Sequence, residues 1–195
     1  MAKKHFYTQK LLNTFWGFVN EDISKLPQCK FFTKGILYTQ DALYSSDTKF
    51  IMKATIPDVP KEFKGKICDN KEFVLGEWED ENLETLNKVC EQTRPKSFIL
   101  NVDKWKKVYN QYKTKKRPKN YDRLSPYECV ELTDGLVVKT KDFNKFVNFC
   151  EKNDIRLIKY NDTSYTCISN YLQLVGTNCN NFFVEDEKLF LNKYE

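Results

Sequence analysis

Residues 136–160 read LVVKTKDFNKFVNFCEKNDIRLIKY, and the spacing of their apolar side chains changes twice. Leu136 to Thr140 is typical of a strand. From Asp142 to Lys152 the apolar residues recur every three or four positions, which predicts a helix with one buried face. Those apolar residues are Phe143, Phe146, Val147 and Cys150. Ile155 to Tyr160 then alternates between apolar and polar residues, so a second strand is expected after the helix.

Three more segments have the spacing of an amphipathic helix. They run from Thr8 to Val19, from Asp80 to Gln92 and from Asp103 to Tyr112. Thr8 and Asp103 are the expected N-caps, because a side-chain oxygen can accept a hydrogen bond from a free amide of the first turn. Trp16 and Trp105 fall on the apolar faces, and we expect both in the core.

Short apolar runs between turn residues predict the strands. We expect Thr133-Asp134-Gly135 to join two of them in a hairpin, because glycine tolerates the positive φ that a tight turn needs. The expected strands are residues 35–39, 42–46, 49–56, 97–100, 127–132, 136–140, 155–160, 165–168, 171–176, 182–184 and 188–191.

The order of these elements repeats along the chain. A helix followed by three short strands occurs near the N-terminus and again after residue 142, and strands lead into the helices that begin at 103 and 142. We therefore predict an α+β fold of repeated βαβββ units, with the helices packed on one face of antiparallel sheets. A boundary at residues 93–96 would divide the chain into an N-terminal half, 1–94, and a C-terminal half, 95–195.

The cysteines indicate a reducing compartment. There are seven, and no two have the C-x-x-C spacing that brings thiolates together on a zinc ion. We expect free, buried thiols and a cytoplasmic protein. No apolar run approaches the ~20 residues that span a bilayer, and the charged start at residues 1–6 is not followed by the apolar region of a signal peptide.

No group of residues indicates catalysis. His5 is the one histidine, and nothing near it in sequence would orient it as a general base. Asp47, Asp58 and Asp69 are isolated and favour turns, while Cys150 lies on an apolar helix face. The six glycines form no phosphate-binding loop. We expect no catalytic residue, no metal and no cofactor, and a protein that works by binding.

Lysine and asparagine occupy the polar faces of three expected helices, in a chain of net charge +5. Ammonium groups neutralise phosphates, and asparagine can bond to phosphate or sugar oxygens. No arginines are arranged to read bases, so such contacts would ignore sequence. An ordinary solvated helix face is the alternative interpretation. The candidate DNA-binding residues are Lys10, Asn13, Lys106, Lys107, Asn110, Lys113, Lys141, Asn144, Lys145 and Asn148.

An acidic segment surrounds Trp78 and contains Glu77, Glu79, Asp80, Glu81 and Glu84. An exposed tryptophan can anchor a protein partner, so Trp78 is the candidate partner-binding residue, with packing against the core as the alternative. Lysine- and asparagine-rich composition is typical of AT-rich genomes, such as those of phages. A second hypothesis is therefore a phage-encoded inhibitor or adaptor that binds a host or defence protein without catalysis.

Three runs near the N-terminus carry a family resemblance: LLNTFWGFV at Leu11 to Val19, GILY at Gly35 to Tyr38, and ALYSSD at Ala42 to Asp47. They resemble the leucine-rich first helix and the following strand pair of DNA sliding clamps of the bacterial or phage polymerase III β-subunit type. Leu43 to Asp47 is similar to the Leu-x-Ala-Thr-Asp run that ends this strand pair. Residues 136–160 are similar to a clamp half-domain, and together these segments cover about half of the chain.

The resemblance implies a processivity factor in DNA replication. Such a protein would bind duplex DNA through its phosphate backbone without sequence specificity, dock a polymerase or another replication protein, and close a ring from identical chains. Two features differ from the family: the chain is short for a ring subunit, and Glu81, Glu84 and Glu91 on the second helix would repel DNA. A reduced clamp, a clamp-like decoy and an unrelated fold with the same local pattern remain open alternatives.

Overall fold

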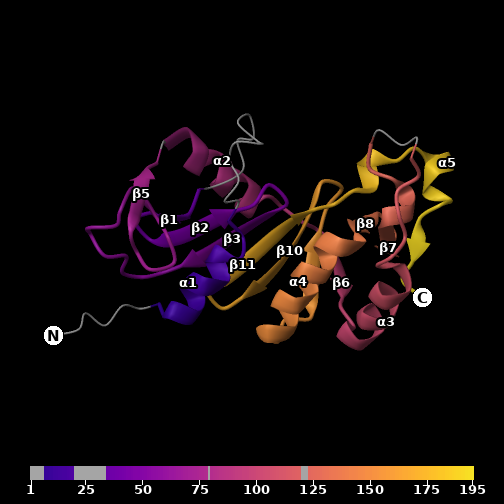
Figure 1. Ribbon diagram of the computed structural model, residues 1–195, viewed down its shortest axis with the longest axis horizontal. Coiled ribbons are helices and arrows are strands. Elements are labelled where there is room, and N and C mark those ends of the chain that lie inside the picture. Colours follow the sequence, from indigo (N-terminus) through magenta and orange to yellow (C-terminus); the bar gives the residue numbers. More distant parts are fainter. Residues whose placement is uncertain (1–6, 20–33, 79, 120–122) are drawn as a thin grey trace. The chain divides into compact units, whose positions relative to one another are not determined.

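The computed structural model describes residues 7–19, 34–78, 80–119 and 123–195 (Figure 1). It has the mixed α+β architecture that the sequence predicts. The chain forms two compact units. Unit 1 consists of residues 1–92 together with 170–175, and unit 2 consists of residues 93–169 together with 176–195. The segment 170–175, expected in the C-terminal half, thus belongs to unit 1.

Among its described residues, unit 1 contains two α-helices and an antiparallel sheet. Its strands follow the order β5-β4-β1-β2-β3-β11, and β4 and β5 were not among the expected strands. The elements are α1 (Gln9–Trp16), β1 (Ile36–Tyr38), β2 (Ala42–Ser46), β3 (Phe50–Thr55), β4 (Lys66–Cys68), β5 (Val74–Glu77), α2 (Asp80–Glu91) and the first part of β11 (Leu172–Thr177).

Helices α1 and α2 cover opposite faces of the sheet of unit 1. Next to α1, Tyr7 contacts Tyr38 and Phe18 contacts Phe50, with ring centroids 5.9 and 5.7 Å apart. Leu86 and Cys90 of α2 instead pack in a core cluster with residues that point the other way, Leu37, Ala42, Tyr44, Ile51 and Val175. The predicted arrangement with helices on one face is therefore wrong for unit 1. The physical reason is that β1 and β2 are buried at every position and carry apolar side chains toward both faces, so both faces must be covered.

Unit 2 contains two sheets and the helices α3 and α4. Strands β6, β9 and β10 pair antiparallel, and β7 pairs with β8 and β12 in a separate three-stranded sheet. The elements are β6 (Lys96–Ile99), α3 (Val102–Tyr112), η2 (Pro126–Glu128), β7 (Cys129–Thr133), β8 (Leu136–Lys139), α4 (Thr140–Lys152), β9 (Leu157–Tyr160), β10 (Ser164–Ser169), the end of β11, η3 (Asn180–Phe182), α5 (Glu185–Lys188) and β12 (Asn192–Lys193).

Aromatic side chains fix α3 and α4 against β10. Trp105 of α3 is fully buried and meets the ring of Phe143 edge to face, at 4.7 Å between centroids. Phe143 and Phe146 of α4 both contact Tyr165. Burial of aromatic side chains dominates core energetics, so this cluster sets where the polar faces of α3 and α4 lie. The two helices contact each other directly (Figure 1).

The helix and hairpin signals are largely confirmed. Thr8 caps α1 through its hydroxyl oxygen, which accepts from the amide of Leu11 at 3.3 Å, and Gly135 has the positive φ of 72° expected in the β7–β8 hairpin. Asp103 is not the cap of α3. Asn101 is, since its Oδ1 accepts from the amide of Lys104 at 3.0 Å, and either residue type can fill that role.

The C-terminal strand pair expected at 182–184 and 188–191 is wrong. The chain forms η3, the single turn α5 and the two-residue strand β12 instead. Glu187 stabilises this turn, because its carboxylate accepts from the amide of Val184 at 3.2 Å while its own amide donates to the Val184 carbonyl at 3.0 Å. This reciprocal cap favours helix over extended backbone.

A candidate nucleic-acid interface

The positive charge of the chain is concentrated in unit 2. Its residues include 19 lysines and arginines against 13 aspartates and glutamates, whereas unit 1 has 13 against 14. Charge that lies on one unit produces a local field that attracts anions. Of the two units, unit 2 is therefore the one whose charge suits an anionic partner.

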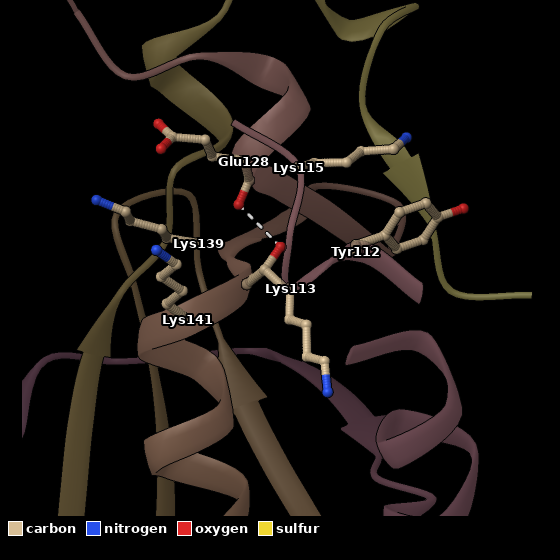
Figure 2. Close-up of a pocket in the computed structure, with 7 residues that line it drawn as sticks. Tyr112, Lys113, Lys115, Glu128, Lys139 and Lys141 are labelled. Atoms are coloured by element: carbon tan, nitrogen blue, oxygen red, sulfur yellow. Dashed lines mark hydrogen bonds between the residues drawn. The ribbon is translucent and has the colours of Figure 1, made fainter. Parts of the chain in front are cut away.

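A small pocket of unit 2 is lined by four lysines (Figure 2). It lies where the end of α3, the segment after it, η2, the end of β8 and the start of α4 come together. The space it encloses is about 10 Å³, room for no more than about one water molecule. The lining residues are Tyr112, Lys113, Lys115, Glu128, Lys139, Thr140 and Lys141.

The first turn of α4 forms one wall of this pocket. The residue before the helix, Lys139, provides no side-chain cap, and the hydroxyl of Thr140 donates to the carbonyl of Glu128 at 2.8 Å (dashed line in Figure 2). The amides of a first helical turn carry a partial positive charge, which adds to the charge of Lys139 and Lys141. Asp142, also in this turn, reduces it.

The lysine side chains around the pocket extend in different directions. Figure 2 shows Lys139 and Lys141 on the side of the Glu128 carboxylate, while Lys113 and Lys115 extend elsewhere. Lys115 is fixed, because its ammonium group donates to Oδ1 of Asn192 at 2.6 Å and lies 4.4 Å from the centroid of the Tyr112 ring. The ammonium groups therefore do not converge on a single anion.

The segment after α3 extends this charge. Residues 113–119 contain five cations and no acid, and every residue of the segment is exposed. With Lys139 and Lys141 these cations make up what we call the basic surface. Its members are Lys113, Lys115, Lys116, Arg117, Lys119, Lys139 and Lys141.

The basic surface includes two of the residues that the sequence proposed, Lys113 and Lys141. Lys113 also donates to Oδ1 of Asn110, another proposed residue, at 3.1 Å. The missed members are Lys115 and Lys139, with Lys116, Arg117 and Lys119. They lie on a loop and at a strand end, so they do not follow the helical spacing of the proposed residues, although the run of charge after α3 is visible in the sequence.

The other proposed residues of α3 and α4 lie beyond the pocket. Lys106 forms an ion pair with Glu151 at 2.7 Å, so less of its positive charge is available to attract a ligand. Asn144 Oδ1 accepts from Nε1 of Trp105 at 3.2 Å and so supports the core. Lys145 is half-buried, while Lys107 and Asn148 are exposed.

Lys10 and Asn13 lie on α1 and so belong to unit 1. Both are exposed. Asn13 Oδ1 accepts from Nε2 of Gln9 at 3.1 Å and from Nδ2 of Asn70 at 2.9 Å, so this side chain already connects α1 to the segment between β4 and β5.

Trp78 packs against a core. Its ring is half-buried beside the cluster that contains Tyr44 and Leu86, and its indole nitrogen is buried with no acceptor among the residues that the structure describes. The neighbouring Glu77 bonds to Lys66, which lowers the pKa of its carboxyl group. Of the alternatives left open by the sequence, these contacts favour the core.

The thiols with perturbed acidity are buried. Cys129 and Cys179 pack in one core cluster of unit 2. The hydrogen bond between them, together with burial, raises the pKa of Cys129, and the same bond lowers the pKa of Cys179. A sulfur that solvent cannot reach does not attack a substrate. The six described cysteines are all buried, while Cys29 and His5 lie outside the described residues.

Two features are absent from the described residues. Across the described ranges, no three or more histidine, cysteine or acidic side chains gather as metal ligands do. None of the helices in the same ranges has both the length and the apolar character needed to cross a membrane.

The sequence was also compared with known proteins. No protein-family model matches the chain, and no curated protein matches it significantly. The fold and the basic surface are thus the observations on which a function can be argued.

Proposed function

We propose that the protein binds duplex DNA without sequence specificity, through contacts between the basic surface of unit 2 and the phosphate backbone. The observation that carries this proposal is the placement of seven cations along the end of α3, the segment 113–119 and the start of α4. Glu128 is the one acidic side chain among the residues that line the pocket at its centre.

The ligand that fits this surface is an extended polyanion. The enclosed space of about 10 Å³ excludes a nucleotide or a metabolite, since small-molecule sites usually enclose about 300 Å³ or more. Lysines that extend in different directions (Figure 2) suit a charge distributed along a backbone. Duplex DNA offers one phosphate charge per about 1.7 Å of its axis.

The side-chain chemistry favours binding that ignores sequence. Six of the seven cations of the basic surface are lysines, which act as point charges, whereas base readout is most often made by bidentate arginine contacts. Arg117 is the exception and is exposed. The lysines would release counterions from the DNA and hold it in no particular sequence register.

A clamp-like role is the finer part of this proposal. It is supported by the order of elements, since a helix followed by three strands occurs as α1-β1-β2-β3 and as α4-β9-β10-β11. In this role identical chains would close a ring, hold DNA through their basic surfaces and dock a polymerase or another replication protein.

Fluorescence anisotropy with two short duplexes of unrelated sequence tests the binding proposal. We expect equal affinities for both duplexes, and we expect binding to weaken steeply between about 0.05 and 0.2 M salt. A variant with Lys139→Glu and Lys141→Glu should lose binding while its circular dichroism spectrum stays unchanged. Absence of binding at low salt would end the proposal. Sedimentation separately tests the ring, since a monomer at working concentration would exclude a closed one.

A further inference from the structure

Large apolar side chains are exposed around the short helix α5 of unit 2. Within nine consecutive residues, Phe182, Val184, Leu189 and Phe190 have exposed fractions of 51, 62, 81 and 52%. Single exposed apolar residues are ordinary, but several together mark an interaction site on a soluble domain. We call these four residues the α5 surface.

The α5 surface is held in place. Phe183 and Leu191, at either end of this segment, are buried in the core of unit 2 with Cys129 and Val137. Between them the amides of Lys188 and Phe190 donate to the carbonyls of Val184 and Glu187 at 3.1 and 3.0 Å. The segment therefore presents its apolar side chains in a fixed arrangement, so binding of a partner would cost little conformational entropy in this segment.

One of the exposed rings also contacts the body of the unit. The centroid of the Phe190 ring lies 5.7 Å from that of Tyr127 in η2. This contact covers part of Phe190, whereas Leu189 remains the most exposed of the four. The apolar surface is thus anchored on one side and open on the other.

Acidic side chains border the α5 surface. Glu185 is exposed and pairs with Lys188 at 2.7 Å, and Glu187 pairs with Arg123. Asp186 is exposed, and no ion pair to it occurs within the described part of the chain. Lys188 and Arg123 offset two of the three acids, which leaves one net negative charge, at Asp186, in contrast to the basic surface.

We infer that the α5 surface docks a protein segment that carries apolar side chains together with lysines or arginines, such as a cationic amphipathic helix. The apolar side chains provide the contact area, and the carboxylates select the charge of the partner. The same carboxylates would repel DNA and anionic lipid headgroups, so neither fits this surface. The inference does not depend on DNA binding by the basic surface.

The probes are three labelled synthetic peptides: a helix of leucine and lysine, a helix of leucine and glutamate, and a lysine peptide without leucine. Fluorescence anisotropy with the full chain should show tighter binding of the first peptide than of the other two. The test variant carries Val184→Ser and Leu189→Ser, which replace exposed side chains. The matched control is Ile99→Ser, because Ile99 is 68% exposed on β6 of the same unit.

The test variant should bind the leucine–lysine peptide about tenfold or more weakly, as expected when central apolar contacts of an interface are lost. The control should bind it as the unmodified chain does, and Asp186→Asn with Glu185→Gln should also weaken binding. The inference is overturned if the test variant keeps full affinity, if the control loses as much, or if either other peptide binds equally well. Thermal melts check that the variants are folded.

Discussion

Replacing Lys141 by alanine removes one exposed cation of the basic surface. Lys141 lies in the first turn of α4, and no described side chain forms an ion pair with it. If it neutralises one phosphate, the slope of log affinity against log salt should become shallower by about 0.9. At about 0.1 M salt, the same relation gives an affinity loss of about eightfold.

The matched control for Lys141 is Lys159→Ala. Lys159 is exposed on β9 of the same unit and alternates with the buried Ile158 and Tyr160. Since Tyr160 pairs with Tyr165, which contacts α4, Lys159 points to the sheet face away from this helix. Both variants change the net charge equally, so we expect a change in slope only for Lys141.

Fluorescence anisotropy at several salt concentrations, with one duplex and all three proteins, measures these slopes. Equal losses for Lys141→Ala and Lys159→Ala would show that the net charge of the chain governs binding. That result would refute the assignment of the basic surface. A slope that stays unchanged in both variants would refute it as well.

Two further predictions concern the cores of the two units. Gly176→Ala would place a Cβ atom 2.5 Å from Cζ of the buried Tyr165. Urea denaturation should therefore show a free energy of unfolding that is lower by about 1–3 kcal/mol. In Gly76→Ala the added Cβ atom meets no atom within 4 Å, so the free energy of unfolding should fall far less. Equal falls in the two variants would contradict the packing argument. Burial first, and then the charge of Glu72, raises the pKa of Cys68 from 9.0 to about 11. As the pH rises from 9.0 to about 11, the unfolded thiol ionises before the folded one, so stability should fall. In Cys68→Ala, the free energy of unfolding measured by urea denaturation should fall less steeply with rising pH. An unchanged dependence on pH would contradict the raised pKa of Cys68.

Periodic segments made most of the fold predictable. The helix expected at 142–152 is observed as Thr140–Lys152, because Phe143, Phe146 and Val147 bury one face against the sheet. Strands β4 and β5 could not be predicted in this way. β4 has three residues, and Gly76 interrupts the apolar run of β5, so neither is long enough to show a period.

The C-terminal segment shows a different limit. Its apolar residues predict a strand pair, yet the segment forms a helical turn in which Leu189 and Phe190 are exposed, while Phe183 and Leu191 enter the core. Hydropathy alone does not distinguish an apolar residue that packs inside from one that is presented outside. The bonds between Glu187 and Val184 stabilise the helical turn that forms here.

The candidate site was predictable only where it follows a helix. Lys113 and Lys141 could be predicted because they continue the polar faces of helices. Lys115 and Lys139 could not, because a loop and a strand end bring them to the same pocket only in the folded chain. The opposite error affects Lys106. Lys106 pairs with Glu151, which is far away in sequence. Only the packing of α3 against α4 shows that the charge of Lys106 is neutralised.

The contribution of residues 170–175 to unit 1 has a consequence for synthesis. This segment supplies Val175 to the core, and its Gln173 amide nitrogen donates to the Cys90 carbonyl at 2.9 Å. During translation about 80 residues follow Gln92 before this strand emerges, which takes about 4–16 s at bacterial or eukaryotic elongation rates. Over that interval the edge of β3 lacks its neighbouring strand and the core lacks Val175. A nascent chain stalled before residue 170 should therefore bind chaperones that a finished chain does not.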